Sequence, residues 1–218
     1  MLTSNNNHGI IIIVSNRQHQ KIGGLKMANK GRAIEEQTAK YFQQFDTVEL
    51  KKADNSTITF KVSDRVLTGG YTTRAKWDIV LNPAVRLQVK STNSNRASVV
   101  NMVPVRNLLK MSKREMIDVQ PALDIINLMS ETGKAVKLAE VSSIDDWRDL
   151  LTYLLFEGTP TAQEIPTMQA NYLLEVSPAG YTIVEKSKAI DYIFNSLVAE
   201  IRTRKDKKEP CLHIRYGK

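Results

Sequence analysis

Three polar residues with a chemically useful spacing stand close together in the middle of this sequence. Asp78 precedes an apolar run, and Gln88 and Lys90 alternate with leucine and valine further along the chain. A carboxylate and an amide oxygen are hard ligands of the kind that Mg²⁺ takes, and an ammonium can neutralise charge on a phosphate. The pattern therefore predicts a Mg²⁺ site for phosphodiester chemistry. The alternative is an edge hairpin with a solvated glutamine and lysine, because this spacing also arises by chance.

Two short strands, residues 77–81 and 85–91, are expected to position these groups. Pro83 lacks an amide hydrogen and restrains the residue before it, so the first strand should end there. Side chains alternate along a strand. Gln88 and Lys90 should therefore share one face, and the valines and leucine beside them should share the other.

The composition indicates a globular protein with an excess of positive charge. The 218 residues are 42% hydrophobic and 25% charged, and 31 Lys and Arg against 23 Asp and Glu give a net charge of +8. A chain of this length can bury one sizeable core. The charge favours a polyanionic partner such as nucleic acid, although a basic protein without such a partner has the same composition.

Other residue types narrow the chemistry and the compartment. Cys211 is the single cysteine and the three histidines are scattered, so neither a disulfide nor a zinc site is expected. A reducing compartment, the cytoplasm, is the expected location. The apolar run 9–14 is too short to span a bilayer and no basic segment precedes it. Neither a membrane partner nor a secretory signal is therefore expected.

The remaining pattern predicts strands interspersed with helices. Strands are expected over 47–68, 137–141, 172–176, 181–185 and 211–215. Helices are expected over 30–45, from Pro104, from Pro121 to Gly133, after a capping box at Ser143–Asp146, and over 187–204. A linker is expected at 157–170. We therefore expect an α/β fold with a mixed central sheet flanked by helices.

Two regions are expected along the chain. Residues 1–26 are expected to be a poorly ordered extension, because the sequence after Met27 is typical of a natural N-terminus. Residues 27–218 are expected to form a single domain.

A polar loop is expected directly after the second strand. Small amides, hydroxyls and one arginine fill it, namely Ser91, Asn93, Ser94, Asn95, Arg96 and Asn101. Such groups hydrogen-bond phosphates and base edges, and a loop joined to Lys90 must lie near the scissile phosphate. We expect these residues to bind DNA, with Arg96 bridging guanine O6 and N7. The alternatives are contacts to the DNA backbone alone or a merely solvated loop.

Four stretches, in order, resemble the small PD-(D/E)xK type II restriction endonucleases whose best-known members cut GCGC and CCGG. They are Gly31–Phe42, Val66–Tyr71 with Trp77–Ile79, Leu87–Lys90 with Ser94–Arg96, and Leu212–Gly217. Asp78, Gln88 and Lys90 match the family's catalytic positions. The sequence departs from the family pattern in having Gln88 at the second acidic position and Trp77 at the proline.

The resemblance implies a restriction-endonuclease-like fold and a PD-(D/E)xK nuclease domain. It implies a monomer or homodimer, part of a restriction-modification system, that hydrolyses duplex DNA at a short GC-rich palindrome with Mg²⁺. Asp78 and Gln88 would bind the metal, and Lys90 would orient the attacking water. Thr72, Arg74 and Arg215 would be further DNA contacts.

The resemblance also gives Glu35 a role as a nearby acidic residue that binds the metal or a water. The alternative for Glu35 is a glutamate favoured by the dipole in the first turn of a helix. Two other functions remain open for the chain as a whole. One is a repair or recombination nuclease that recognises DNA structure, and the other is a DNA-binding module without catalysis.

Overall fold

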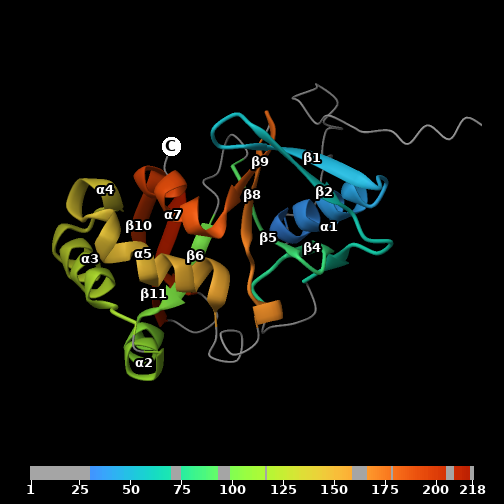
Figure 1. The fold of residues 1–218 in the computed structure, drawn as a ribbon. Coiled ribbons are helices and arrows are strands. Elements are labelled where there is room, and N and C mark those ends of the chain that lie inside the picture. The colour runs from blue at the N-terminus through green and yellow to red at the C-terminus, as the bar shows by residue number, and fades with distance from the viewer. Residues whose placement is uncertain are drawn as a thin grey trace, which may run out of the picture.

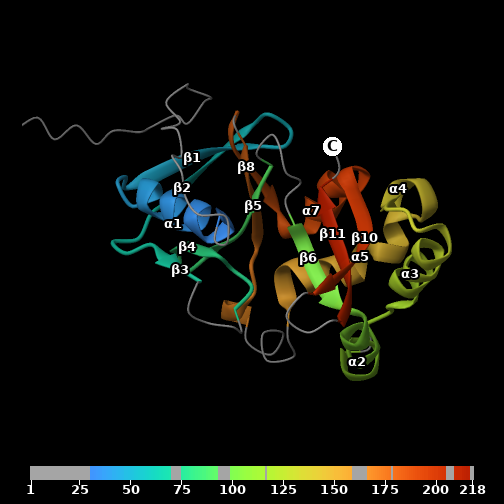
Figure 2. The same ribbon diagram turned by 180° about the vertical axis from the view of Figure 1, so that it is seen from behind.

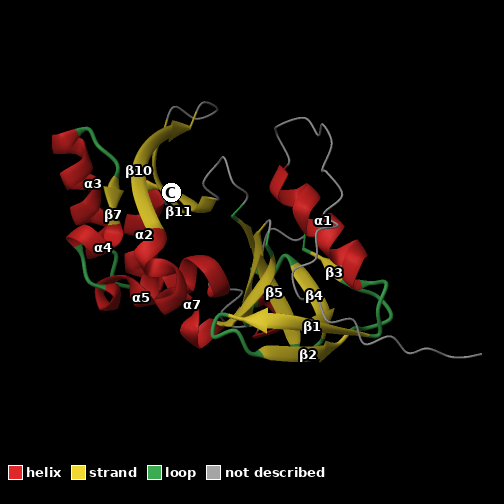
Figure 3. Ribbon diagram, turned by 90° about the horizontal axis from the view of Figure 1, so that it is seen from above, coloured by secondary structure: helices red, strands yellow, loops and turns green. Residues whose placement is uncertain are grey.

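The structure is a computed structural model that describes residues 30–69, 75–92, 99–115, 117–158, 166–177, 179–204 and 209–216. These residues form two β-sheets, each accompanied by helices (Figure 1). Seen from above in Figure 3, the two sheets stand side by side. The expected extension at residues 1–26 lies outside the described residues.

A seven-stranded mixed sheet carries the hairpin of interest. Its strands, in spatial order, are β2 (Thr57–Lys61), β1 (Thr47–Lys52), β9 (Gly180–Glu185), β8 (Tyr172–Ser177), β5 (Val85–Ser91), β4 (Ile79–Asn82) and β3 (Leu67–Thr68). The pairs β1–β9 and β5–β8 are parallel, and the other neighbouring pairs are antiparallel. The predicted mixed sheet is confirmed, and β5 has the predicted bounds.

Side chains on the two faces of this sheet belong to two separate hydrophobic cores. Leu87 and Val89 of β5 pack with Leu174 of β8 against α1 (Lys30–Phe42). Leu173, the neighbour of Leu174, points to the opposite face and joins the larger core under the remaining helices. Because both faces are covered, Gln88 on the second face of β5 is buried, and Arg86 and Lys90 beside it are partly buried.

The second sheet has four antiparallel strands. In spatial order they are β6 (Val99–Pro104), β11 (Glu209–Tyr216), β10 (Leu197–Arg204) and β7 (Val136–Lys137). The helices around it are α2 (Val105–Glu115), α3 (Gln120–Thr132), α4 (Leu138–Val141), α5 (Ile144–Thr152) and α7 (Lys186–Ile193). A π-helical turn (Tyr153–Glu157) continues α5, and single 3₁₀ turns lie at Pro166–Met168 and Phe194–Ser196.

The two sides of the second sheet differ. Helices α5 and α7 lie on the side that faces the viewer in Figure 1. From behind, in Figure 2, strands β6, β10 and β11 stand in front with no described helix across them.

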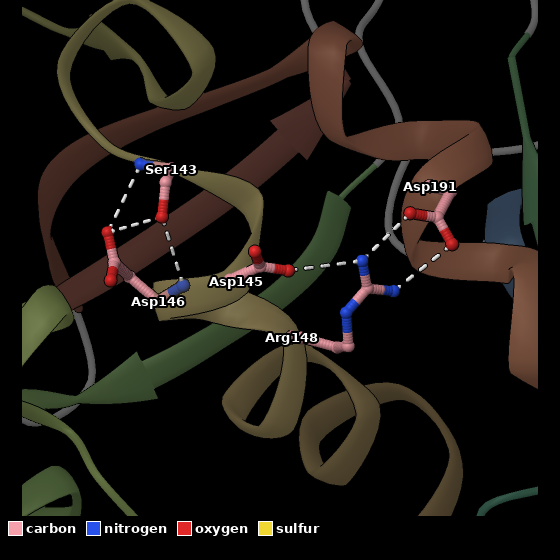
Figure 4. Close-up of polar contacts among 5 residues, drawn as sticks. All are labelled: Ser143, Asp145, Asp146, Arg148 and Asp191. Atoms are coloured by element: carbon pink, nitrogen blue, oxygen red, sulfur yellow. Dashed lines mark hydrogen bonds and ion pairs between the residues drawn. The ribbon is translucent and has the colours of Figure 1, made fainter.

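Local helix signals in the sequence are confirmed. Gly133 ends α3 with a left-handed backbone, at φ +66°. Ser143 and Asp146 form the predicted capping box before α5, as Figure 4 shows. The Ser143 amide donates to the Asp146 carboxylate at 3.2 Å, and the Asp146 amide donates to Ser143 Oγ at 3.3 Å. Trp147 and Leu150 behind this cap are fully buried.

The predicted helix over 187–204 is wrong beyond its first half. Helix α7 ends at Ile193, and residues 197–204 form strand β10. Ile190, Ile193 and Leu197 keep a helical spacing across this boundary, which conceals it. After Leu197 the core-facing residues recur every second position, as in a strand. Leu197 and Ala199 face the core, and Glu200 faces the other way.

Two further predictions are corrected. The strand expected over 137–141 is limited to Val136–Lys137, and Leu138–Val141 is the single turn α4. The loop expected to reach Asn101 gives way to β6 at Val99. Strands β6 and β10 build the second sheet, which is why the sequence indicated one sheet where the structure has two.

Candidate active site

The β4–β5 hairpin fixes the Asp78 carboxylate. Asp78 lies one residue before β4, where its amide donates to Leu87 O at 2.8 Å. Its side-chain Oδ2 accepts from the Val89 amide at 2.7 Å and from the side-chain amide of Gln88. Within the described residues, no hydrogen bond reaches Oδ1. The carboxylate is therefore held in place with one oxygen left for a ligand.

Gly69 permits the close backbone contact that supports Asp78 from the other side. Its amide donates to Asp78 O at 2.7 Å. A Cβ on Gly69 would lie only 3.3 Å from the carbonyl carbon of Trp77 and closer still to its oxygen. A side chain here would push β3 and the start of β4 apart.

Gln88 and Lys90 lie on the same face of β5, as the alternation predicts. Gln88 is buried, with 6% of its surface exposed, and it pairs in register with Leu173 of β8. Lys90 pairs in register with Glu175. Since Ile79 is opposite Leu87, the preceding Asp78 stands opposite Gln88. The three residues identified from the sequence therefore share one end of the hairpin.

Glu35 reaches this group from α1. Its side chain is half-buried, and burial together with the charge of Asp78 raises the pKa of Glu35 to about 7, against the opposing effect of Lys90. Glu35 is therefore within electrostatic range of Asp78 and Lys90, and α1 packs against β4 and β5. The structure thus brings together Glu35, Asp78, Gln88 and Lys90, the four residues that the sequence nominated.

Lys76 is a further charged residue at this place, and the sequence analysis did not identify it. Its Nζ donates to Leu154 O at 2.8 Å. Burial and the charge of Lys90 lower the pKa of Lys76 to about 8, while Asp78 acts in the opposite direction. The sequence could have indicated Lys76 through its position two residues before Asp78. In an extended chain, residues two apart have their side chains on the same side.

The stem of Lys76 passes through a space that a glycine leaves open. Gly158 has φ +81°, and a Cβ there would lie 2.6 Å from Cγ of Lys76. The carbonyl that Lys76 binds, Leu154 O, also accepts from Asn101 Nδ2 at 3.0 Å. Lys76 therefore ties the hairpin to the π-helical turn, and Asn101 ties β6 to the same carbonyl. In a π-helical turn the hydrogen-bonding pattern of the α-helix changes, so a backbone carbonyl such as Leu154 O can accept from side chains instead.

The oxygen donors at this site fit a divalent cation. Asp78 Oδ1, the Gln88 amide oxygen and the Glu35 carboxylate are the ligand types that Mg²⁺ takes. The Gln88 NH₂ is turned toward Asp78 Oδ2, which leaves its oxygen for another partner. The described part of the chain has no group of three or more His, Cys, Asp or Glu that could hold a metal. A set of two carboxylates and one amide is consistent with that finding and favours weak binding.

The predicted DNA contacts are only partly visible. Thr72, Arg74, Asn93, Ser94, Asn95 and Arg96 lie outside the described residues. Ser91 ends β5 beside Lys90. Asn101 lies on β6, where its side chain binds Leu154 O and the Met102 amide. Arg215 lies on β11. All of these contacts remain predictions.

Comparison with protein-family models, curated proteins and solved structures gives no match. The function therefore has to be argued from the site itself. Across the described ranges, no helix is long and apolar enough to cross a membrane.

Glu35→Gln is expected to raise the melting temperature of the metal-free protein at pH 8 and to change it little at pH 5. The folded-state pKa of about 7 lies above the ordinary 4.5, so the folded protein binds the proton more tightly. Stability is therefore present at low pH and is lost as pH rises from about 4.5 through 7. Thermal melts in EDTA at both pH values measure the effect.

The control for that measurement is Glu36→Gln, which removes the same charge from a side chain that is 46% exposed. An equal shift for both variants, or a Glu35→Gln shift that does not depend on pH, would contradict the enclosed position of Glu35.

Lys76→Ala is expected to relieve part of the destabilisation caused by Gly158→Ala. A side chain at Gly158 strains a positive φ, at about 1–3 kcal/mol, and collides with the Lys76 stem. Only the collision disappears when the stem is removed. A double-mutant cycle by urea unfolding should show a coupling of about 0.5–3 kcal/mol.

Gly133→Ala is the matched control. Gly133 also has a positive φ, but apart from its chain neighbours no described residue lies within 4 Å of the place that its new methyl group would take. The cost of this change should be the same with and without Lys76. Additive costs for the Gly158 and Lys76 changes would show that the stem does not occupy this space.

Proposed function

We propose that this protein is a Mg²⁺-dependent endonuclease that cuts duplex DNA at a specific site, a type II restriction enzyme acting in the cytoplasm. The observation that carries the proposal is the grouping of Asp78, Gln88, Lys90 and Glu35 at one end of the β4–β5 hairpin. Two carboxylates, an amide and a lysine are groups that bind a divalent cation beside a phosphate.

Each residue has a distinct role in this proposal. Mg²⁺, when bound, would polarise the scissile phosphate and ease the deprotonation of a water molecule. Asp78 Oδ1 and the Gln88 amide oxygen would hold the cation, and Glu35 would bind the cation or its water. Lys90 would orient the attacking water and offset the charge that grows on the phosphate. The products would be a 5′-phosphate and a 3′-hydroxyl.

The choice of substrate rests on two supports. The net charge of +8 favours a polyanion, and DNA backbone phosphates would then provide most of the affinity. The resemblance of the four sequence stretches favours a restriction enzyme with a short GC-rich palindrome as its target.

Digestion of a sequenced plasmid tests the proposal. With Mg²⁺, the purified protein should give discrete fragments whose ends map to one sequence by run-off sequencing, and EDTA should prevent cutting. Cutting at branched or damaged DNA irrespective of sequence would indicate a repair or recombination nuclease instead. Binding without any cutting, in Mg²⁺ or Mn²⁺, would indicate a DNA-binding module.

Lys90→Ala is expected to slow cleavage by at least about 100-fold, because it removes a cation from the growing charge on the phosphate. Specific DNA binding should be largely preserved, since backbone contacts elsewhere carry the affinity. Single-turnover cleavage and binding titrations separate the two effects. Lys61→Ala, on the outer strand β2, is the control and should cleave normally. Substantial cleavage by Lys90→Ala would remove this residue from the mechanism.

Gln88→Glu is expected to tighten Mg²⁺ binding in the absence of DNA while keeping part of the cleavage activity. The variant adds a negative charge and keeps an oxygen ligand. Calorimetry on the free protein should show weak binding for the natural chain and tighter binding for the variant. Gln88→Met, which has no oxygen, is the control. Tight Mg²⁺ binding by the natural chain alone would contradict the proposed ligand set.

A further inference from the structure

The side of the second sheet that has no described helix across it carries a compact polar group, in which His213 is buried and Glu200 and Arg215 are partly buried. On β10, Leu197, Ala199 and Ile201 face the core, so Glu200 and Arg202 face the side without described helices (Figure 2). On β11, His213 is opposite Glu200, and Arg215 is two residues further on the same face. The alternation of two neighbouring strands thus places one acid, two arginines and one histidine together.

Glu200 is the centre of this group. Its Oε1 lies 2.7 Å from Nδ1 of His213, 2.7 Å from Nε of Arg202 and 3.2 Å from Nε of Arg215. Burial opposes ionisation, but the His213 hydrogen bond and the two arginines together hold the pKa of Glu200 below its ordinary value. One carboxylate oxygen therefore orients two guanidinium groups through their Nε atoms.

The outer ends of both guanidinium groups are left for a ligand. Within the described residues, no hydrogen bond involves the Nη atoms of Arg202 or Arg215. Arg202 is accessible, with 58% of its side chain exposed, and Arg215 is partly buried, with 25% exposed. The two Nη atoms of an arginine form a planar donor pair that matches two oxygens of a phosphate.

Arg148 shows the opposite use of a guanidinium group. Figure 4 shows its Nη atoms directed at two carboxylates. Nη1 and Nη2 lie 3.1 and 2.9 Å from the Asp191 oxygens, and Nη2 lies 3.5 Å from Asp145. The Nη donors of Arg148 are thus engaged within the protein, whereas those of Arg202 and Arg215 form no hydrogen bond to the described residues.

The arginine pair is connected to the candidate active site through the neighbouring strands. Arg215 pairs in register with Val99, at the start of the strand that follows β5. Tyr216, the next residue on β11, has a raised pKa, chiefly because it is buried and in part because the charge of Glu175 acts on it. Glu175 pairs in register with Lys90. The end of β11 therefore lies near the part of β5 that carries Lys90.

We propose that Arg202 and Arg215, held by Glu200, form a binding site for backbone phosphates of the nucleic acid substrate, separate from the scissile phosphate. This inference rests on the proposed function for its ligand. Removal of either arginine should remove about one phosphate contact. Binding of a duplex of mixed sequence should then weaken, and the slope of log K against log salt should fall by about one unit.

The test is a set of anisotropy titrations in EDTA, on one labelled duplex of mixed sequence, at several salt concentrations. Arg202→Gln and Arg215→Gln should each reduce the salt slope by about one, and the double variant by about two. Arg202→Lys should keep the slope, since the charge remains. Arg148→Gln is the matched control, because it removes the same charge from an arginine whose donors are already engaged, and its slope should equal that of the natural chain.

Equal slopes for Arg202→Gln, Arg215→Gln and Arg148→Gln would overturn the inference, because net charge alone would then explain the binding. Plasmid cleavage by the natural chain, measured in parallel, reports separately on the proposed function. Cleavage with equal slopes would reject only the arginine site. Reduced slopes without cleavage would reject only the nuclease and retain the arginine site on a DNA-binding protein.

Discussion

The enclosed carboxylate of Asp78 is the constraint around which the site is built. Burial raises the pKa of Asp78, and the charge of Lys90, the hydrogen bond from the Val89 amide and the charge of Lys76 act against it. An unpaired buried charge is costly, so an acid in this position needs cations or strong donors around it. The register of β4 with β5 provides both, because it sets Asp78 opposite Gln88 and brings Lys90 onto the same face.

The same constraint reaches beyond the hairpin. Lys76 is one of the two lysines that offset the Asp78 charge, and its Nζ is held by the Leu154 carbonyl. That carbonyl is available because α5 continues as a π-helical turn, and the stem fits because residue 158 is glycine. The geometry of the site therefore depends on packing around the second sheet, although the catalytic candidates all belong to α1 and the hairpin.

The features that could be predicted from the sequence are those that depend on residues close together in the chain. The bounds of β5, the alternation of Gln88 and Lys90, the capping box at Ser143 and the end of α3 at Gly133 each depend on a few neighbouring residues. Strand β10 was missed because its first residue keeps the helical spacing of α7, and what makes it a strand is pairing with β11 and β7. Lys76 was missed for a similar reason. Its significance arises from Leu154 and Gly158, which lie about eighty residues away in the chain.

The balance of charge at the candidate site bears on how a nucleic acid would be bound. Asp78 and Glu35 carry the negative charge there, and Lys76 and Lys90 carry the positive charge. Between the pKa of Glu35, about 7, and that of Lys76, about 8, these four charges nearly cancel, so before a cation binds they offer a phosphate little net attraction. The attraction must then come from positive charge elsewhere, to which the proposed phosphate site at Arg202 and Arg215 would contribute. On the proposed function, DNA would bind first through its backbone, and its scissile phosphate would complete a metal site that the protein alone forms only weakly.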